Sequence, residues 1–449
     1  MAHRLRAWLC THPGDAMMTM QMTKVSAALA ALIVAMPAGA QTVAITGGKV
    51  YPVSSAPIEN ATVLIRDGKI VAVGSNVTIP ADAQRIDATG KWVTPGLINA
   101  GTQLGLVEVG QVQDTRNASA VGHDHIAASF TAWEGLNTQS VLIAPARREG
   151  VTNVVIVPSP GGKLVAGQAA FLSLVEGMPT DMLVKSPIAM VAQVSDNQAA
   201  GTGARGELLN RLRELIEDTR AFMRNRAAFE RAETRDYSAS RLDLEAMIPV
   251  VEGRLPLLVG ADKATDIDAA LRIAKENNLK IIIGGGAEAW MIADKLAAAR
   301  VPVLTGAMNN IPGSFTTLGQ NQENAGLLRR AGVQVVITGN GPGDEESFNV
   351  RNIKQEAGNA VAYGMSWNDA LRAITLTPAE VFGVADRIGS LQTGRDANVV
   401  IWSGDPFEFT TVPEHVYVKG HEYTAPDRQQ LLTDRYKNMP FQWGTPVHR

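Results

Sequence analysis

The chain has little cysteine, histidine or net charge, and few long hydrophobic runs. Its single cysteine, Cys10, stands near the amino terminus, so the rest of the chain has no thiol for a disulfide, a Cys nucleophile or a zinc site. The formal net charge is −3 over 449 residues, which gives no reason to expect a nucleic-acid partner or an anionic membrane surface. Beyond residue 40, no apolar segment reaches the roughly 20 residues that a membrane-spanning helix needs.

The first 40 residues have the pattern of a secretory leader. Lys24 precedes the apolar segment 25–36, and residues 38–40 (Ala-Gly-Ala) form a small-residue cleavage site. The apolar segment is too short to span a bilayer. We therefore expect a signal peptide over 22–40, with Met1 or Met22 as the start. After cleavage near Ala40, the protein is expected to be exported, to the periplasm or beyond.

Histidine is nearly absent from the middle of the chain. None of the seven histidines lies between residues 126 and 414. The seven are His3, His12, His123, His125, His415, His421 and His448. A Ser-His-Asp triad built within that region is therefore excluded, and the sequence also lacks a G-x-S-x-G nucleophile motif and a G-x-x-x-x-G-K-[ST] phosphate loop.

Short strand-like segments occur at both ends of the chain. Residues 43–92 include ATVLIRDGKIVAVG, in which Asp67-Gly68 predicts a type I′ hairpin turn. Segments 389–405 and 415–423 have the same character. Because the termini of a domain often lie close together, we expect 41–92 and 389–425 to form one small β-sandwich, followed by a tail over 426–449.

Residues 93–388 alternate between apolar, strand-sized runs and helical stretches such as 264–278 and 287–300. The apolar runs are VTNVVIVPS (151–159), PIAMVAQV (187–194), LPLLVGA (255–261), LKIIIGGG (279–286), VPVLTGA (301–307) and VQVVITGNG (333–341). This alternation predicts an α/β fold, a TIM-like (β/α)8 barrel, with a doubly wound open sheet as the alternative. Stretch 206–237 predicts one long amphipathic helix, inserted in this pattern, with its charges on a solvated face.

Three segments resemble parts of the metal-dependent amidohydrolase superfamily, and in particular its exported imidazolonepropionase-like and dipeptidase-like branch. IRDGKIVAVG (65–74) is similar to the first hairpin of the family, and IDATGKWVTPGLINA (86–100) to the approach to its first barrel strand. AITLTPAEVFGVADRIGSLQTGRDANVVIWSGDPFE (373–408) resembles the closing helix and the return to the sandwich. The resemblance covers roughly 43–425. It implies a barrel with a composite sandwich domain and a hydrolase of C–N bonds in dipeptides or cyclic amides.

The resemblance also implies a catalytic divalent metal, but this sequence departs from the family at the ligand positions. Gly101 and Gln103 stand where a His-x-His pair ends the first barrel strand. Gly260 and Gly285 stand at the histidine positions of strands 5 and 6, and Asn340, or Gly339 if the register slips by one, at the aspartate of strand 8. Glycine offers no side-chain ligand, and an asparagine amide cannot act as a base. We therefore expect degenerate catalytic positions and no metal cofactor, with zinc or another divalent metal as the alternative.

One cluster could hold a relocated metal. His123 and His125 flank Asp124 in a polar loop, and Asp114 or Asp196 could supply a further ligand. The alternative is a solvated loop ahead of a helix, where a carboxylate is favourable.

Two further loops carry candidate ligand-binding groups. Segment 158–168, PSPGGKLVAGQ, resembles a family loop that faces the pocket, and could bind a carboxylate or carbonyl group. Its candidate residues are Gly161, Gly162, Lys163 and Gln168. The alternative is a turn that only requires positive φ. Segment 341–352 contains Asp344, Glu345 and Glu346, which suggest a pocket rim, a weak calcium site or a solvated loop.

Three functions are compatible with these observations. The first is a non-catalytic binding or regulatory member that holds a small amide or peptide-like ligand and pairs with an active amidohydrolase paralogue. The second is an active hydrolase with a relocated metal site at His123 and His125. The third is a structural scaffold with a filled barrel and no pocket. By resemblance we also expect a homo-oligomer. The loops that set specificity do not identify the ligand.

Overall fold

Two eight-stranded sheets, A and B, organise the part of the chain that the structure describes. The structure is a computed structural model that describes residues 42–195, 204–308, 312–339 and 345–437. The predicted leader and Cys10 lie outside the described residues. All of these described residues belong to one compact unit. None of the described helices combines the length and hydropathy that crossing a bilayer requires.

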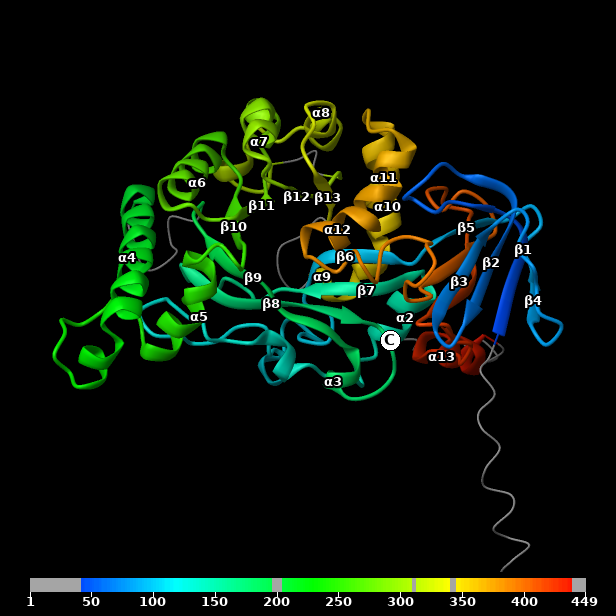
Figure 1. The fold of residues 1–449 in the computed structure, drawn as a ribbon, viewed down its shortest axis with the longest axis horizontal. Coiled ribbons are helices and arrows are strands. Elements are labelled where there is room, and N and C mark those ends of the chain that lie inside the picture. Colours follow the sequence, from blue (N-terminus) through cyan, green and yellow to red (C-terminus); the bar gives the residue numbers. More distant parts are fainter. Residues whose placement is uncertain (1–41, 196–203, 309–311, 340–344, 438–449) are drawn as a thin grey trace, which may run out of the picture. The chain divides into compact units, whose positions relative to one another are not determined.

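Sheet A is built from both ends of the chain. Its central strands β5 and β14 pair antiparallel, with Val93 opposite Ile401, so the two ends lie side by side (Figure 1). Its strands are β1 (Thr42–Val50), β2 (Ile58–Arg66), β3 (Lys69–Gly74), β4 (Gln84–Asp87), β5 (Trp92–Pro95), β14 (Val399–Trp402), β15 (Pro413–Val418) and β16 (His421–Glu422). Between β2 and β3, Asp67 (φ 52°) and Gly68 (φ 73°) form the predicted tight turn with two positive φ angles.

Sheet B forms a nearly closed barrel in the order β6 to β13. Its strands are β6 (Leu97–Thr102), β7 (Val151–Ile156), β8 (Val165–Ser173), β9 (Leu183–Gln193), β10 (Leu257–Ala261), β11 (Ile281–Gly285), β12 (Val303–Thr305) and β13 (Val335–Ile337). The TIM-like barrel predicted from the sequence is thus confirmed, but not every strand is parallel. Strand β8 runs antiparallel to both β7 and β9.

Helices cover the outer face of sheet B, as α6, α7 and α8 do beside β10 to β13 in Figure 1. The helices are α2 (Ile143–Arg148), α3 (Pro179–Met182), α4 (Arg205–Glu230), α5 (Arg241–Val251), α6 (Ala264–Asn277), α7 (Ala293–Ala299), α8 (Asn324–Arg330), α9 (Glu345–Phe348), α10 (Ile353–Ala362), α11 (Trp367–Ala373), α12 (Leu376–Val381) and α13 (Arg428–Tyr436). Short 3-10 turns occur at Gln113–Thr115, Ala132–Gly135, Ala289–Ile292, Phe315–Thr317 and Val350–Asn352.

The strands of the barrel are buried on both faces. Alternate residues such as Leu258 and Ile282 pack with one another in an inner core. Their neighbours Val259 and Ile283 pack in an outer core that includes Ile267 of α6. Burial on both faces explains why these strands appear in the sequence as continuous apolar runs and not as alternating ones.

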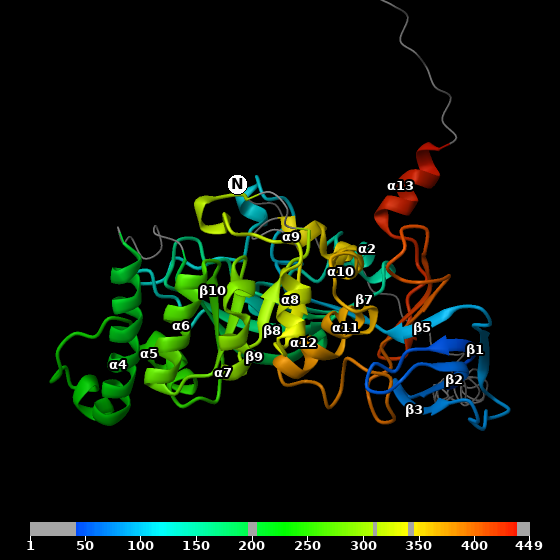
Figure 2. The ribbon, with the colours of Figure 1, turned by 90° about the horizontal axis from the view of Figure 1, so that it is seen from above.

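The inserted helix is shorter than the sequence predicts. Helix α4 ends at Glu230 rather than near residue 237, because the chain turns back toward α5 (Figure 2). The returning segment brings Arg235 and the Ser238 N–H onto the fully buried carboxylate of Asp218. The predicted polar face therefore includes one charge, on Asp218, that is buried and paired instead of solvated.

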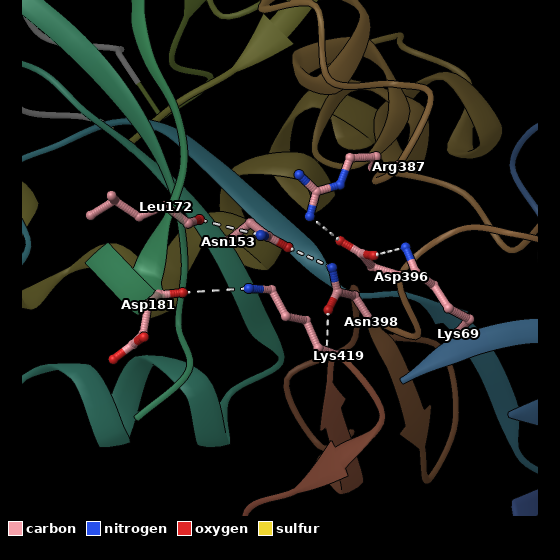
Figure 3. Close-up of polar contacts among 8 residues, drawn as sticks. All are labelled: Lys69, Asn153, Leu172, Asp181, Arg387, Asp396, Asn398 and Lys419. Carbon is pink, nitrogen blue, oxygen red and sulfur yellow. Dashed lines mark hydrogen bonds and ion pairs between the residues drawn. The ribbon is translucent and has the colours of Figure 1, made fainter. Parts of the chain in front are cut away.

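A buried polar network joins sheet A to the barrel (Figure 3). The Asn398 side chain donates to Oδ1 of Asn153 on β7 at 3.0 Å and accepts from the Lys419 N–H at 2.8 Å. Asn153 in turn donates to the Leu172 carbonyl on β8 at 3.2 Å. Both asparagines are almost completely buried, so these bonds replace hydrogen bonds that water would otherwise supply.

The variant N398A should lower the free energy of unfolding by about 2 kcal/mol, because it leaves the buried Asn153 amide and the Lys419 N–H short of a partner. Urea denaturation followed by circular dichroism would measure the loss. The matched control is N210A, on an exposed part of α4, which should change stability by less than about 0.5 kcal/mol. An equally small effect of N398A would contradict the role of this network.

Candidate functional site

The parallel strands of sheet B end at one side of the barrel, which we call the barrel mouth. It consists of the described residues that follow β6, β7 and β9 to β13, together with the segment that precedes the antiparallel strand β8. Val165, at the start of β8, pairs with Ala192 near the end of β9, which places that segment at the same side. In barrels of this kind, binding and catalytic groups are located at the carboxyl ends of the strands.

Three glycines occupy strand ends at the barrel mouth. Gly101 is the fifth residue of β6, and a Cβ there would lie 3.5 Å from the Thr338 side chain just beyond β13, an ordinary contact distance. Gly260 and Gly285 lie near and at the ends of β10 and β11. All three glycines are incompletely buried, so the mouth has little side-chain bulk at these strand ends.

Neighbouring side chains have taken the space beside two of these glycines. A Cβ at position 260 would lie 1.8 Å from Oε1 of Gln193, which comes from the end of β9. A Cβ at position 285 would lie 2.4 Å from Oδ1 of Asp262. Gly285 also has φ +87°, a conformation that L side chains rarely adopt. A larger residue at either position therefore requires a neighbour to move.

Comparison with known proteins connects this geometry to a family. Residues 257–423, from β10 to β16, match the model of the amidohydrolase family. The imidazolonepropionase of Mesorhizobium japonicum is 23% identical over 376 residues, which cover 77% of this chain and 87% of that protein. The amidohydrolase TasK of Hapsidospora irregularis is 22% identical over 393 residues, which cover 80% of this chain but only 39% of that longer protein.

Solved structures agree with the sequence comparisons. An amidohydrolase from Thermotoga maritima superposes with a TM-score of 0.77 at 28% identity, over 86% of this chain and all of that one. A prolidase complexed with N-methylphosphonate-L-proline shares the fold, with a TM-score of 0.53 at 16% identity over 86% of this chain and all of that one. This chain belongs to the amidohydrolase superfamily.

The residues at the predicted metal-ligand positions do not fit a divalent metal. Gly101, Gly260 and Gly285 have no donor side chain, and Gln103 offers only a buried, neutral amide. A histidine at position 260 would displace Gln193, and one at 285 would require a strained backbone. Asn340 and Asp196 lie outside the described residues. Within the residues that the structure places, no three His, Cys, Asp or Glu side chains gather as a metal site would require.

The His123–His125 segment forms a turn at the barrel mouth. The N–H of Leu164, ahead of β8, donates to the His125 carbonyl at 3.0 Å, and the turn itself closes between His123 and Ile126. Its side chains are exposed, and His123 lies 3.4 Å from the Asp124 carboxylate, which is itself 74% exposed. Asp114 is also exposed, in a separate 3-10 turn. The structure thus brings the turn to the mouth without gathering a ligand set around it.

The Gly-rich loop 158–164 also lies at the barrel mouth, between β7 and β8. Gly161 (φ +51°) and Gly162 (φ +76°) turn the chain, and the Lys163 amine donates to Ser119 Oγ at 3.3 Å. Burial lowers the pKa of Lys163. Gln168 does not belong to the loop, because it lies within β8 and its Nε2 donates to the Ala128 carbonyl at 3.0 Å.

Among the acidic candidates after β13, Asp344 lies outside the described residues, and Glu345 begins α9 with Glu346 next to it. The structure instead reveals a buried carboxylate, Glu356, and a half-buried one, Asp262, neither of which local sequence patterns indicated. Asp262 follows β10, and Glu356 on α10 accepts from the N–H groups of Ala307 and Met308 beyond β12 at 2.9 and 3.1 Å. Burial raises the pKa of Glu356.

Burial also raises the pKa of Asp262, to about 6, because its carboxyl group lies beneath Gly285 and near the acidic groups of Asp266 and Glu288. A carboxylate soon after a buried strand was the only sequence signal for this residue. Its half-buried position depends on Gly285 at the end of β11, a strand that is separated from Asp262 by helix α6.

The variant D262N should be more stable than the unchanged protein at pH 7, by about 2 kcal/mol. The folded carboxyl group keeps its proton up to about pH 6, whereas the unfolded one loses it near pH 4, so the unchanged protein loses stability as the pH rises from 4 to 6. Urea denaturation at several pH values would show the gain of D262N, and its disappearance below about pH 4.

The control for this prediction is D268N on α6, which should have the opposite effect. Lys295 binds Asp268 at 2.7 Å and lowers its pKa, so the neutral variant should lose stability at pH 7. If D262N shows no gain at pH 7, the Asp262 carboxyl group is not buried as described.

Proposed function

We propose that this amidohydrolase-superfamily protein binds a small amide or peptide-like ligand at the barrel mouth and does not hydrolyse it through a bound metal. The observation that carries the proposal is the replacement of the metal-ligand side chains at Gly101, Gln103, Gly260 and Gly285. Because no histidine lies between residues 126 and 414, no shift of alignment can return one to strands 5 and 6.

The superfamily fold supports a ligand at the mouth even without the metal. The similar proteins include imidazolonepropionases and a prolidase that was solved with N-methylphosphonate-L-proline, a proline derivative. A barrel that has lost the activating metal keeps the strand-end surface on which such a compound is bound. We further propose export after cleavage near Ala40, and a regulatory role beside an active amidohydrolase paralogue.

The second candidate is an active hydrolase with a metal at His123 and His125. It is favoured by the position of their turn, which the Leu164 N–H ties to the barrel mouth. It is disfavoured by the exposure of the His123 and Asp124 side chains, because a tight metal site needs three or four converging ligands.

Metal analysis separates the two candidates. A chain starting at residue 41, expressed without a His-tag in zinc-supplemented medium, should hold less than about 0.1 metal ion per chain, because too few donors converge to bind one tightly. Plasma mass spectrometry before and after addition of Zn²⁺, Mn²⁺ or Fe²⁺ would measure the content. About one metal per chain that disappears in the His123→Ala/His125→Ala variant would instead establish the relocated site.

Ligand binding can be tested by placing a larger side chain at the barrel mouth. G101L should fold normally, because its Cβ would be at contact distance from Thr338, and should change the free energy of unfolding by less than about 1 kcal/mol. Its longer side chain would occupy the end of β6 and weaken ligand binding by about tenfold or more.

The probes for this test are the N-acetyl derivatives of glycine, alanine, leucine and histidine, each as the free acid and as the primary carboxamide. Calorimetric titration of the unchanged protein and of G101L would measure their binding. If no probe binds the unchanged protein, or if binding is the same in G101L, the proposed ligand site at the mouth is wrong.

A further inference from the structure

Three basic side chains are deeply buried among the described residues, and only two of them face a carboxylate. Arg147, 7% exposed, binds Glu176 at 3.2 Å. Lys354, 5% exposed, binds Glu149 at 2.9 Å. Lys163, 8% exposed, has Ser119 Oγ as its hydrogen-bond acceptor, and no described carboxylate binds it. Lys163 is therefore the buried amine whose charge the described part of the chain does not balance.

Lys163 also differs from the other two in position, because it lies at the barrel mouth. The following residue, Leu164, accepts from the Gln193 N–H at the end of β9 and donates to the His125 carbonyl. These two bonds hold the loop between β7 and β8 against the strand end where Gln193 stands beside Gly260.

The Lys163 amine lies close to two exposed residues, Gly161 and Ser119. A Cβ at Gly161 would lie 3.4 Å from Nζ and 3.0 Å from Ser119 Oγ, and both Gly161 and Ser119 are exposed. The absence of a side chain at Gly161 leaves a short path from solvent to the amine. Its left-handed backbone, with φ +51°, is one that glycine adopts at low cost.

An ammonium group taken out of water without a counter-charge is unfavourable, and a bound anion would remove that penalty. We propose that Lys163, with Ser119 beside it, binds the carboxylate of the ligand at the barrel mouth, so that the ligand is an N-acyl amino acid or a peptide with a free carboxyl terminus. The proposal rests on the ligand site proposed above and names its chemical class. A carboxylate accepts a charge-assisted hydrogen bond from an ammonium group, which a neutral carboxamide does not replace.

The acid and carboxamide probes test this proposal, with the protein treated with a chelator so that the result does not depend on metal. In the unchanged protein, the best acid should bind about tenfold or more tightly than its carboxamide, because a hydrogen bond between charged groups is lost in the amide. In K163M, which keeps the length and apolar character of the side chain, acid and carboxamide should bind equally.

Two further measurements separate ligand binding from a structural role. K280M removes the same charge from an exposed site just ahead of β11, at the opposite end of the strand from the mouth, and should keep the preference for the acid. Without ligand, K163M should melt at a higher temperature than the unchanged protein, because it removes an unbalanced buried charge.

Each outcome has a distinct meaning. If carboxamides bind the unchanged protein as tightly as acids, the proposed function stands and the role of Lys163 is wrong. If K163M retains the preference, or melts at a lower temperature and binds acids as before, Lys163 is structural and the proposal is overturned. If no acid or carboxamide binds at all, both this proposal and the proposed function fail.

Discussion

A single buried asparagine, Asn398, joins the two ends of the chain to the barrel. Its side chain bonds to Asn153 on β7 and to the Lys419 N–H (Figure 3). Its carbonyl accepts from the Gly96 N–H at 2.9 Å, immediately ahead of β6. Since β6 begins at the next residue, Leu97, this contact sets where the first barrel strand starts. The positions of Gly101 and Gln103 at the barrel mouth depend on it.

Side chains near Asn398 add further contacts at this junction between the chain ends and the barrel, which we call the joint. Asp396, almost fully buried, binds Lys69 at 2.5 Å and Arg387 at 3.2 Å, and so ties the start of β3 to the segment that leads into β14 (Figure 3). Trp402 on β14 donates to Thr94 Oγ1 on β5 at 2.8 Å, inside the sheet that both ends share. Because each buried charge and amide in this joint has a partner, the fold gains a defined arrangement there without an unpaired polar group.

At the barrel mouth, in contrast, the described polar and charged groups are not all paired. Its strand ends carry glycines, the space beside Gly260 and Gly285 is taken by Gln193 and Asp262, and the amine of Lys163 is buried without a described carboxylate. Unbalanced or desolvated groups cost stability, and natural proteins concentrate them at functional sites. The contrast between the fully paired joint and the incompletely paired mouth is consistent with selection for a ligand at this end of the barrel.

Most of the barrel could be predicted from the sequence, because its strands are buried on both faces and appear as apolar runs bounded by glycine. Strand β8 was missed. Its Gly167, at φ +130°, and the small residues around it resemble a loop, and the strand is defined only by antiparallel pairing with β7 and β9. The end of α4 was also misjudged, because the contacts of Asp218 with Arg235 and Ser238 form only after the chain turns back.

The sequence by itself determined which types of side chain each strand can bring to the barrel mouth. A strand whose sequence contains no histidine cannot supply a histidine in any fold. Only the tertiary structure decided how deeply the remaining side chains are buried there and which charged groups lie near them. The raised pKa of Asp262 depends on its burial next to β11, and the lack of a carboxylate beside Lys163 among the described residues depends on which segments the fold brings near. Both depend on how segments far apart in the chain are brought together, which local sequence patterns do not encode.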